Sequence, residues 1–254
     1  ILHNNVTAIS ESKDQGLWLA NMEGGFQYFN PATDEKKLYR KKLGQANSLS
    51  HDNALSILED RKGDVWIGTY GGGLNRYTPQ NGQFQVYRPD SAKPISDLRI
   101  PVLMEDQEGS IWAGSFNGLN KLTLGTQNFE RYYAANDPRG ELPNQRIWSL
   151  IEGQNAALWS GTGKGLVVQM PGQDKILNTI TIGGKVVELP QQTIFALHED
   201  SNGGIWIGTR LGLHHLVFHK NKVMAYSTEQ GLVHNTVYGI QEDKQGLIWI
   251  TTSR

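Results

Sequence analysis

Short apolar runs alternate with clusters of turn residues along the whole chain, and the same order of runs returns six times. In the second repeat the runs are N-A-L-S-I-L-E-D, V-W-I-G-T, L-N-R-Y and F-Q-V-Y-R, separated by polar or glycine-rich turns. Runs of this length that mix apolar, β-branched and aromatic residues and end at turn residues predict strands. Each repeat therefore predicts a four-stranded antiparallel meander.

A tryptophan marks the second run of every repeat. These residues are Trp18, Trp66, Trp112, Trp159, Trp206 and Trp249, and the steps between them are 48, 46, 47, 47 and 43 residues. Strand-rich repeats of about 40 to 50 residues indicate a propeller or a related array. We expect an all-β propeller domain over 1–254. Its blades are expected at approximately 4–40, 52–88, 98–133, 145–182, 192–226 and, incomplete, 235–254.

The sequence predicts five complete blades and half of a sixth, and this number bears on whether the blades can close into a ring. A propeller closes only when its first and last blades meet, since two apolar sheet faces otherwise remain open. We therefore expect the chain to be a fragment of a longer, seven-bladed propeller, with the missing blades as partners of those present.

Acidic residues and glycines recur at fixed distances from each tryptophan. Seven residues before it stand Glu11, Glu59, Glu105, Glu152, Glu199 and Glu242, and Asp60, Asp106, Asp200 and Asp243 follow four of them. Asp side chains cap tight turns, and glycine accepts a positive φ there. A small residue two positions after the tryptophan fits sheet packing, in which the large ring fills the space that it leaves. Because these residues recur in every repeat, we interpret them as scaffold in preference to calcium ligands, acid-base groups or an aromatic ligand platform.

The repeats differ where the first run of each begins. Fifteen residues before the tryptophan stand His3, His51, Asp97, Asn144, Gln191 and His234, and thirteen before it stand Asn5, Asn53, Arg99, Arg146, Thr193 and Thr236. The loops after the second run add Tyr70, Phe116, Lys164 and Arg210 on the same expected face. A shared scaffold with variable polar positions is how one fold carries an individual site. We hypothesise a ligand-binding mouth of the propeller channel here; the alternative is that these residues only solvate the strand starts and loops.

The composition of the chain limits the kinds of binding and catalysis that we expect. The 24 Lys and Arg residues balance 25 Asp and Glu residues without a long run of either sign, so nothing indicates nucleic-acid binding. Cysteine is absent, and no catalytic or phosphate-binding motif is found. On a strand His215 and His219 would lie about 13 Å apart, too far to share a metal ion. We therefore predict no cofactor, no metal and no catalytic residue.

The pattern E-D-x-x-G-x-[VI]-W-I-G-T-x-x-G-G-L-x-x-[YF], over 59–77 and more weakly over 199–216, resembles the two-component regulator propeller repeats. Such repeats are found in the extracytoplasmic sensor halves of bacterial membrane signalling proteins. The resemblance implies a non-catalytic, periplasmic input domain that senses a small molecule, a glycan or a glycan breakdown product. It also implies a histidine kinase or diguanylate cyclase output elsewhere in the parent protein, and a homodimer.

Two other functions stay open at this point. Streptogramin lyases look similar, because they are propellers with tryptophan-containing repeats and a catalytic histidine plus a metal on one face, although their blade signature differs. A propeller that serves only as a scaffold for protein interactions is the other alternative.

Overall fold

The computed structural model describes residues 3–126, 128–132, 142, 145–173 and 175–253 of the 254-residue chain. This part consists almost entirely of strands, which form five four-stranded antiparallel sheets and two two-stranded ones. Within each four-stranded sheet the strands lie side by side in sequence order. The predicted all-β fold with four-stranded antiparallel blades is thus confirmed.

The strands follow the predicted repeats. The first sheet holds β1 (Val6–Glu11), β2 (Leu17–Asn21), β3 (Gly25–Asn30) and β4 (Glu35–Tyr39). The second holds β5 (Ala54–Glu59), β6 (Val65–Thr69), β7 (Leu74–Thr78) and β8 (Gln83–Tyr87). The third holds β9 (Val102–Glu105), β10 (Ile111–Ser115), β11 (Gly118–Leu122) and β12 (Glu130–Tyr132).

The remaining strands continue this order. The fourth sheet holds β13 (Ile147–Glu152), β14 (Leu158–Thr162), β15 (Gly165–Gln169) and β16 (Ile176–Leu177). The fifth holds β19 (Ile194–Glu199), β20 (Ile205–Thr209), β21 (Leu213–Val217) and β22 (Lys222–Tyr226). The two-stranded sheets are β17 (Thr179–Ile182) with β18 (Lys185–Glu188), and β23 (Val237–Glu242) with β24 (Ile248–Thr252). Two 3₁₀ turns, Phe218–Lys220 and Thr228–Gln230, flank β22.

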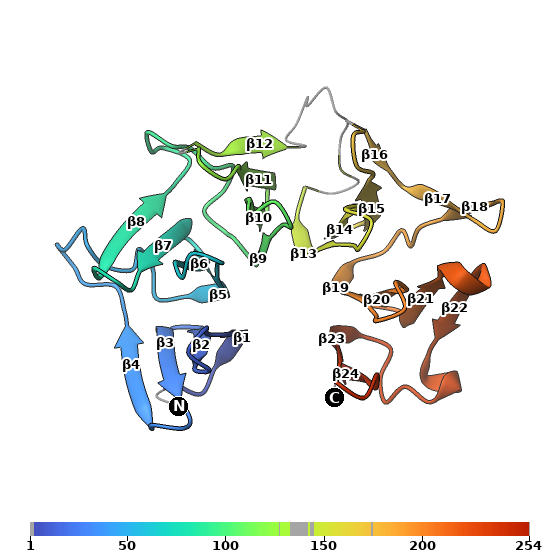
Figure 1. Cartoon of the computed structure of the whole chain (residues 1–254), viewed down its shortest axis with the longest axis horizontal. Coiled ribbons are helices and arrows are strands. Elements are labelled where there is room, and N and C mark those ends of the chain that lie inside the picture. The colour runs from blue at the N-terminus through green and yellow to red at the C-terminus, as the bar shows by residue number, and fades with distance from the viewer. Residues whose placement is uncertain (1–2, 127, 133–141, 143–144, 174, 254) are drawn as a thin grey trace. The chain divides into compact units, whose positions relative to one another are not determined.

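The chain forms two compact units, residues 1–132 and 133–254. In the first unit the first strands β1, β5 and β9 lie along one side, and the fourth strands β4, β8 and β12 lie along the opposite side (Figure 1). In the second unit the first strands β13, β19 and β23 are neighbours. The sequence predicts a single propeller domain over 1–254. Whether the two units form one domain depends on how they join, so this expectation stays a prediction.

The connection between the fourth and fifth sheets contains a hairpin that the sequence interpretation missed. We expected the fourth blade to reach residue 182 and a plain loop to follow, whereas β17 pairs with β18 over these residues. The turn between them is Gly183-Gly184, with φ of 57° and 76°. Two successive glycines with positive φ between alternating runs are typical of a two-residue hairpin turn.

The aspartates next to the recurring glutamates cap turns, as predicted. Asp60 Oδ1 accepts the backbone N–H groups of Lys62 and Asp64, at 2.9 and 3.0 Å, and Asp60 Oδ2 accepts the Trp66 indole N–H at 2.8 Å. The tryptophan bond recurs from Trp112 to Asp106, from Trp206 to Asp200 and from Trp249 to Asp243. One carboxylate thereby fixes both the turn and the ring that follows it.

The recurring glutamates join neighbouring sheets. Four of the six accept the backbone N–H of the residue five positions before the tryptophan of the preceding sheet. The pairs are Glu59 with Lys13 (3.5 Å), Glu105 with Arg61 (2.9 Å), Glu199 with Gln154 (2.8 Å) and Glu242 with Ser201 (2.7 Å). We call this contact the glutamate clamp. It gives these four glutamates a structural role between neighbouring sheets.

Tryptophan and glycine pack between sheets, as predicted. A Cβ added to Gly68 would lie 2.3 Å from both the Ile100 carbonyl oxygen and Ser56 Oγ, so the neighbouring sheet approaches this strand at backbone distance. Ser56 Oγ donates to that same carbonyl oxygen at 2.8 Å. The small Ser56 side chain therefore fits the close approach of the next sheet.

A β-bulge interrupts the first strand of most sheets. In β1, β5, β13, β19 and β23 the register against the second strand shifts by one residue, eleven positions before the tryptophan. The extra residues are Thr7, Leu55, Trp148, Phe195 and Tyr238. In the third sheet the same position is Pro101, directly before β9. A bulged residue is left out of the ladder, so a proline there removes no ladder bond.

Candidate functional site

The predicted mouth residues are distributed over both units. Four of the residues fifteen before the tryptophan share one contact, in which a side chain accepts the backbone N–H two residues later. The acceptors are His3 Nδ1 (3.4 Å), His51 Nδ1 (3.0 Å), Asp97 Oδ1 (2.8 Å) and His234 Nδ1 (3.0 Å). Histidine and aspartate can both provide this acceptor, which explains why the position keeps its polarity while its identity varies.

The other two residues at this position behave differently. Gln191 donates its side-chain amide to the carbonyl oxygen of Leu189 at 2.9 Å. Asn144 lies outside the described residues.

Three of the residues thirteen before the tryptophan tie a strand start to the preceding sheet. Asn53 Oδ1 accepts the backbone N–H of Glu23 at 3.0 Å. In the second unit Thr193 donates to the Gly163 carbonyl oxygen and Thr236 to the Arg210 carbonyl oxygen, at 2.9 and 3.3 Å. These three side chains therefore have a structural role at the strand starts.

Arg99 departs from this arrangement. Its guanidinium donates to Asp97 through Nε at 2.8 Å and Nη2 at 2.7 Å, a two-pronged ion pair. It also lies over the Phe116 ring, with 4.8 Å from Cζ to the ring centroid. Tyr70 meets Phe116 edge to face at 6.2 Å. The structure thus brings together four predicted residues from two neighbouring sheets of the first unit.

These groups stand beside an open recess of about 600 Å³. Its lining residues are His51, Asn53, Tyr70, Gly71, Pro89, Ser96, Asp97, Leu98 and Arg99. The Tyr70 side chain is 46% exposed, so part of its ring is available to a ligand. We call this feature the Arg99 recess.

The charges at the Arg99 recess are matched. Burial alone would raise the pKa of the Asp97 carboxyl, but hydrogen bonds from Arg99 outweigh it and the pKa lies below its ordinary value. The same hydrogen bond raises the pKa of Arg99. Both groups are therefore charged near neutral pH and neutralise each other. The recess offers a ring, an amide, hydroxyl and imidazole groups with little net charge, which suits an uncharged polar ligand.

The remaining predicted residues lie in the second unit. Arg146, Lys164 and Arg210 are exposed. The Arg146 carbonyl oxygen accepts the N–H of Gly163 at 3.1 Å, and the Lys164 N–H donates to Thr162 Oγ1 at 3.2 Å. These contacts hold the backbones of the loops.

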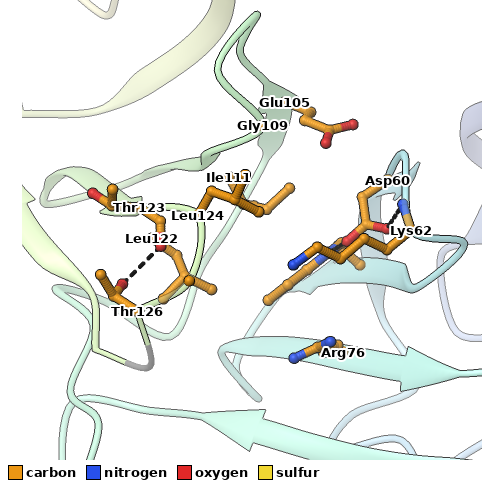
Figure 2. A pocket seen from close by; sticks show the side chains of 12 residues that line it. Asp60, Lys62, Arg76, Glu105, Gly109, Ile111, Leu122, Thr123, Leu124 and Thr126 are labelled. Carbon is orange, nitrogen blue, oxygen red and sulfur yellow. Dashed lines mark hydrogen bonds between the residues drawn. The ribbon is translucent and has the colours of Figure 1, made fainter.

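A second hollow, between the second and third sheets, is a structural cleft. Figure 2 shows its lining, with Asp60, Lys62 and Arg76 on one side and Leu122 and Leu124 on the other. Its volume is about 50 Å³, enough for one or two water molecules. Arg76 is held beside it, because its Nε donates to Asp64 at 2.9 Å and its guanidinium lies over Trp66.

The equivalent cleft between the first and second sheets is wider, at about 360 Å³. Its Trp18 pairs across the ladder with Tyr28, where Trp66 pairs with Arg76. Gly16 stands where the second repeat has Asp64. The first repeat therefore lacks the arginine and aspartate pair that fills the neighbouring cleft.

His214 and His215 lie on β21 and make contacts within the fifth sheet. His215 Nε2 lies 2.8 Å from Asp200 Oδ2, and its ring stacks on Trp206 with centroids 3.8 Å apart. Burial lowers the pKa of His214. In the described part of the chain, no group of three or more His, Asp and Glu side chains is placed to hold a metal ion. Nor does any helix described there have the length and apolar character to cross a membrane.

The sequence interpretation missed the aromatic residues at the bulges. Trp148, Phe195 and Tyr238 occupy one position in three consecutive repeats, eleven before the tryptophan. Their alignment was visible in the sequence. The signal was overlooked because a bulge changes the face to which a strand residue points, and no sequence pattern marked the bulge.

Three stretches of the chain match a known protein family. Residues 48–71, 188–210 and 231–254 match the family described as "Two component regulator propeller". No curated protein sequence matches the chain significantly.

Three solved structures share the fold. The extracellular domain of BT3049 from B. thetaiotaomicron, named as a hybrid two component system, is 18% identical with a TM-score of 0.76, covering 99% of this chain and 39% of its own. PorZ, a surface component of the type-IX secretion system of Porphyromonas gingivalis, is 16% identical with a TM-score of 0.75, covering 98% of this chain and 37% of its own. Virginiamycin B lyase from Staphylococcus aureus is 15% identical with a TM-score of 0.66, covering 98% of this chain and 78% of its own.

This chain thus spans about two fifths of the first two relatives, at 39% and 37% of their lengths. At these identities the likeness establishes the fold alone. Together with the three family matches, it confirms what the spacing of the tryptophans predicts. Three stretches of this chain match the two component regulator propeller family, and the chain has an all-β propeller fold.

Proposed function

We propose that this chain is a non-catalytic, ligand-sensing input domain of a bacterial membrane signalling protein, and that the Arg99 recess binds the ligand. The ligand is an uncharged polar small molecule, with a sugar or a short glycan as the best fit. The observation that carries the proposal is the Arg99 recess itself, in which a half-exposed tyrosine ring stands beside a neutralised Arg99–Asp97 pair.

The contacts favour a sugar over an ionic ligand. Arg99 already donates two hydrogen bonds to Asp97, so an anion would have to displace an internal carboxylate. A sugar instead can place its C–H face on Tyr70 and its hydroxyls near Asn53 and His51, which line the same recess. This arrangement provides an apolar surface with a few oriented polar groups, the usual composition of a ligand site.

The family and fold support the place of the domain in a larger protein. The matched repeats are those described for two component regulators, and a similar fold forms the extracellular domain of BT3049. We infer a periplasmic position, with a histidine kinase or diguanylate cyclase output and further propeller blades in the parent protein. A homodimer would bring two such outputs together.

Titration calorimetry of the purified chain with a panel of mono- and oligosaccharides tests the recess. We expect Tyr70→Ala and Arg99→Gln to weaken binding about tenfold or more, because each removes a wall of the recess. Arg40→Gln is the matched control: in the same unit its exposed guanidinium lies 3.6 Å from Asp52 and donates to the Glu23 carbonyl oxygen at 2.8 Å, and Arg40 does not line the recess. Equal affinities in all four proteins would exclude the recess.

A lyase is the second candidate, since virginiamycin B lyase shares the fold over 78% of its own length. Incubation of the chain with a streptogramin B and a divalent cation separates the two functions. Linearised product at a rate above the protein-free control would favour the lyase and contradict a purely sensory role.

A further inference from the structure

Three aromatic rings form a continuous row on the first strands of the second unit. Trp148 and Phe195 meet edge to face with centroids 6.4 Å apart, and Phe195 and Tyr238 follow at 5.0 Å. They come from β13, β19 and β23, which are neighbours in this unit. We call them the aromatic row.

The bulges place these rings away from the core of the unit. Ile194 and Ala196, on either side of Phe195, are buried, and Ile194 belongs to the apolar cluster between the sheets. Phe195 and Trp148 are not part of that cluster and remain half-buried. Tyr238 is 54% exposed. An extra residue in a strand redirects its side chain, which is why bulges often stand beside binding sites.

The fold itself does not require aromatic residues here. The same position in the first unit holds Thr7, Leu55 and Pro101, and the sheets there form with the same strand order. The bulge is therefore common to both units, whereas the rings occur in one. Adjacent, partly exposed aromatic side chains that the scaffold does not need are typical of an interaction site.

We propose that the aromatic row is a platform on which an elongated, uncharged oligosaccharide stacks its successive rings. The inference rests on the proposed sensing function but assigns a site separate from the Arg99 recess. The electron-rich face of an aromatic ring attracts the C–H bonds on the flat face of a sugar ring. The rings are inclined to one another, at 63° between Trp148 and Phe195 and at 52° between Phe195 and Tyr238, so the aromatic row is a twisted surface. A ligand that contacts several of its rings at once binds with an affinity that increases with ligand length.

Other stacking ligands fit the row less well. Single-stranded nucleic acid also stacks on aromatic rings, but it needs a basic groove along its phosphates. The chain has a formal net charge of −1, with 24 basic and 25 acidic residues. An uncharged ligand with repeated flat rings needs no such groove.

The test measures binding of glucose, cellotetraose, maltotetraose and xylotetraose by titration calorimetry and by tryptophan fluorescence. We expect at least one tetrasaccharide to bind about tenfold or more tightly than glucose, and Trp148→Ala or Phe195→Ala to remove that gain. Tyr238→Ala should weaken binding, while Tyr238→Phe should keep it because the ring is retained. Leu55→Ala, at the same bulge position in the first unit, should leave affinity unchanged.

Three results would overturn the proposal. These are equal affinity for glucose and the tetrasaccharides, no binding of any of them, or unchanged binding in the Trp148→Ala and Phe195→Ala proteins. Near-ultraviolet circular dichroism confirms that each variant is folded. Loss of binding in Arg99→Gln but not in Trp148→Ala would support the recess alone, whereas tighter binding of a short single-stranded DNA than of any saccharide would assign the row to another ligand.

Discussion

Glu105 and Arg61 join the second and third sheets through two contacts made by one carboxylate. Glu105 Oε2 accepts the Arg61 backbone N–H at 2.9 Å, and Oε1 pairs with the Arg61 side-chain Nε at 2.8 Å. The arginine continues into the same turn, where its Nη1 donates to the Gln107 carbonyl oxygen at 3.0 Å. In this glutamate clamp one carboxylate holds both the backbone and the side chain of an arginine.

Replacing Glu105 by glutamine should lower the free energy of unfolding by about 1–3 kcal/mol, because charge-assisted bonds to Arg61 become neutral ones in a half-buried site. Urea denaturation followed by tryptophan fluorescence measures the loss. Glu108→Gln, an exposed change in the adjoining turn, serves as the control and should alter stability by no more than about 0.5 kcal/mol. Equal effects of the two substitutions would argue against the clamp.

The turn capped by Asp60 allows one substitution that should lower stability and a second that should restore part of it. Asp60→Gly removes three hydrogen bonds and should cost about 2–4 kcal/mol. The fourth sheet has Gly153 at this position and caps its turn with Asn155, whose Oδ1 accepts the Ala157 N–H at 3.1 Å. Adding Lys62→Asn, at the position equivalent to Asn155, should recover part of the loss. No recovery in the double variant, by the same denaturation assay, would contradict an interchangeable cap.

Two glycine-to-alanine changes separate close packing from backbone conformation. At Gly68 an added Cβ meets the Ile100 carbonyl oxygen at 2.3 Å, so the sheets must move apart, and we expect a cost of about 2 kcal/mol or more. Gly82 has φ of 70°, and a Cβ added there would meet no atom within 4 Å, so alanine should cost only the conformational term of about 1 kcal/mol. Thermal unfolding of the two variants should therefore rank Gly68→Ala as clearly the less stable.

Acidification should weaken the second unit through His214. Burial lowers the pKa of this imidazole, so the unfolded chain binds a proton more readily than the folded one. Its contribution to stability is present above the unfolded pKa of about 6.5 and is lost as the pH falls through the lower folded value. His214→Gln should reduce the drop in denaturation midpoint between about pH 7.5 and 5. His219→Gln, an exposed change, should leave that drop as it is in the original protein.

Much of the scaffold could be predicted from residue spacing. The tryptophans, the capping aspartates and the glycines recur because each repeat solves the same local problem of turning a chain and packing a ring. The hairpin β17–β18 was missed, although Gly183-Gly184 between alternating runs is a local signal, because the strands were assigned by analogy with the other repeats. The roles of the glutamates could not be predicted, since their partners lie in the neighbouring sheet, 45 residues away for Glu199 and Gln154.

The candidate sites divide in the same way. The class of fold, the repeat and the places where the repeats differ could be predicted from the sequence, because they depend on local pattern and on comparison of one repeat with another. The pairing of Arg99 with Asp97 over Phe116, and the row of Trp148, Phe195 and Tyr238, became visible in the folded chain alone. The physical reason is that strand pairing and a one-residue bulge set the direction of each side chain, and both depend on contacts between sheets that no single repeat contains.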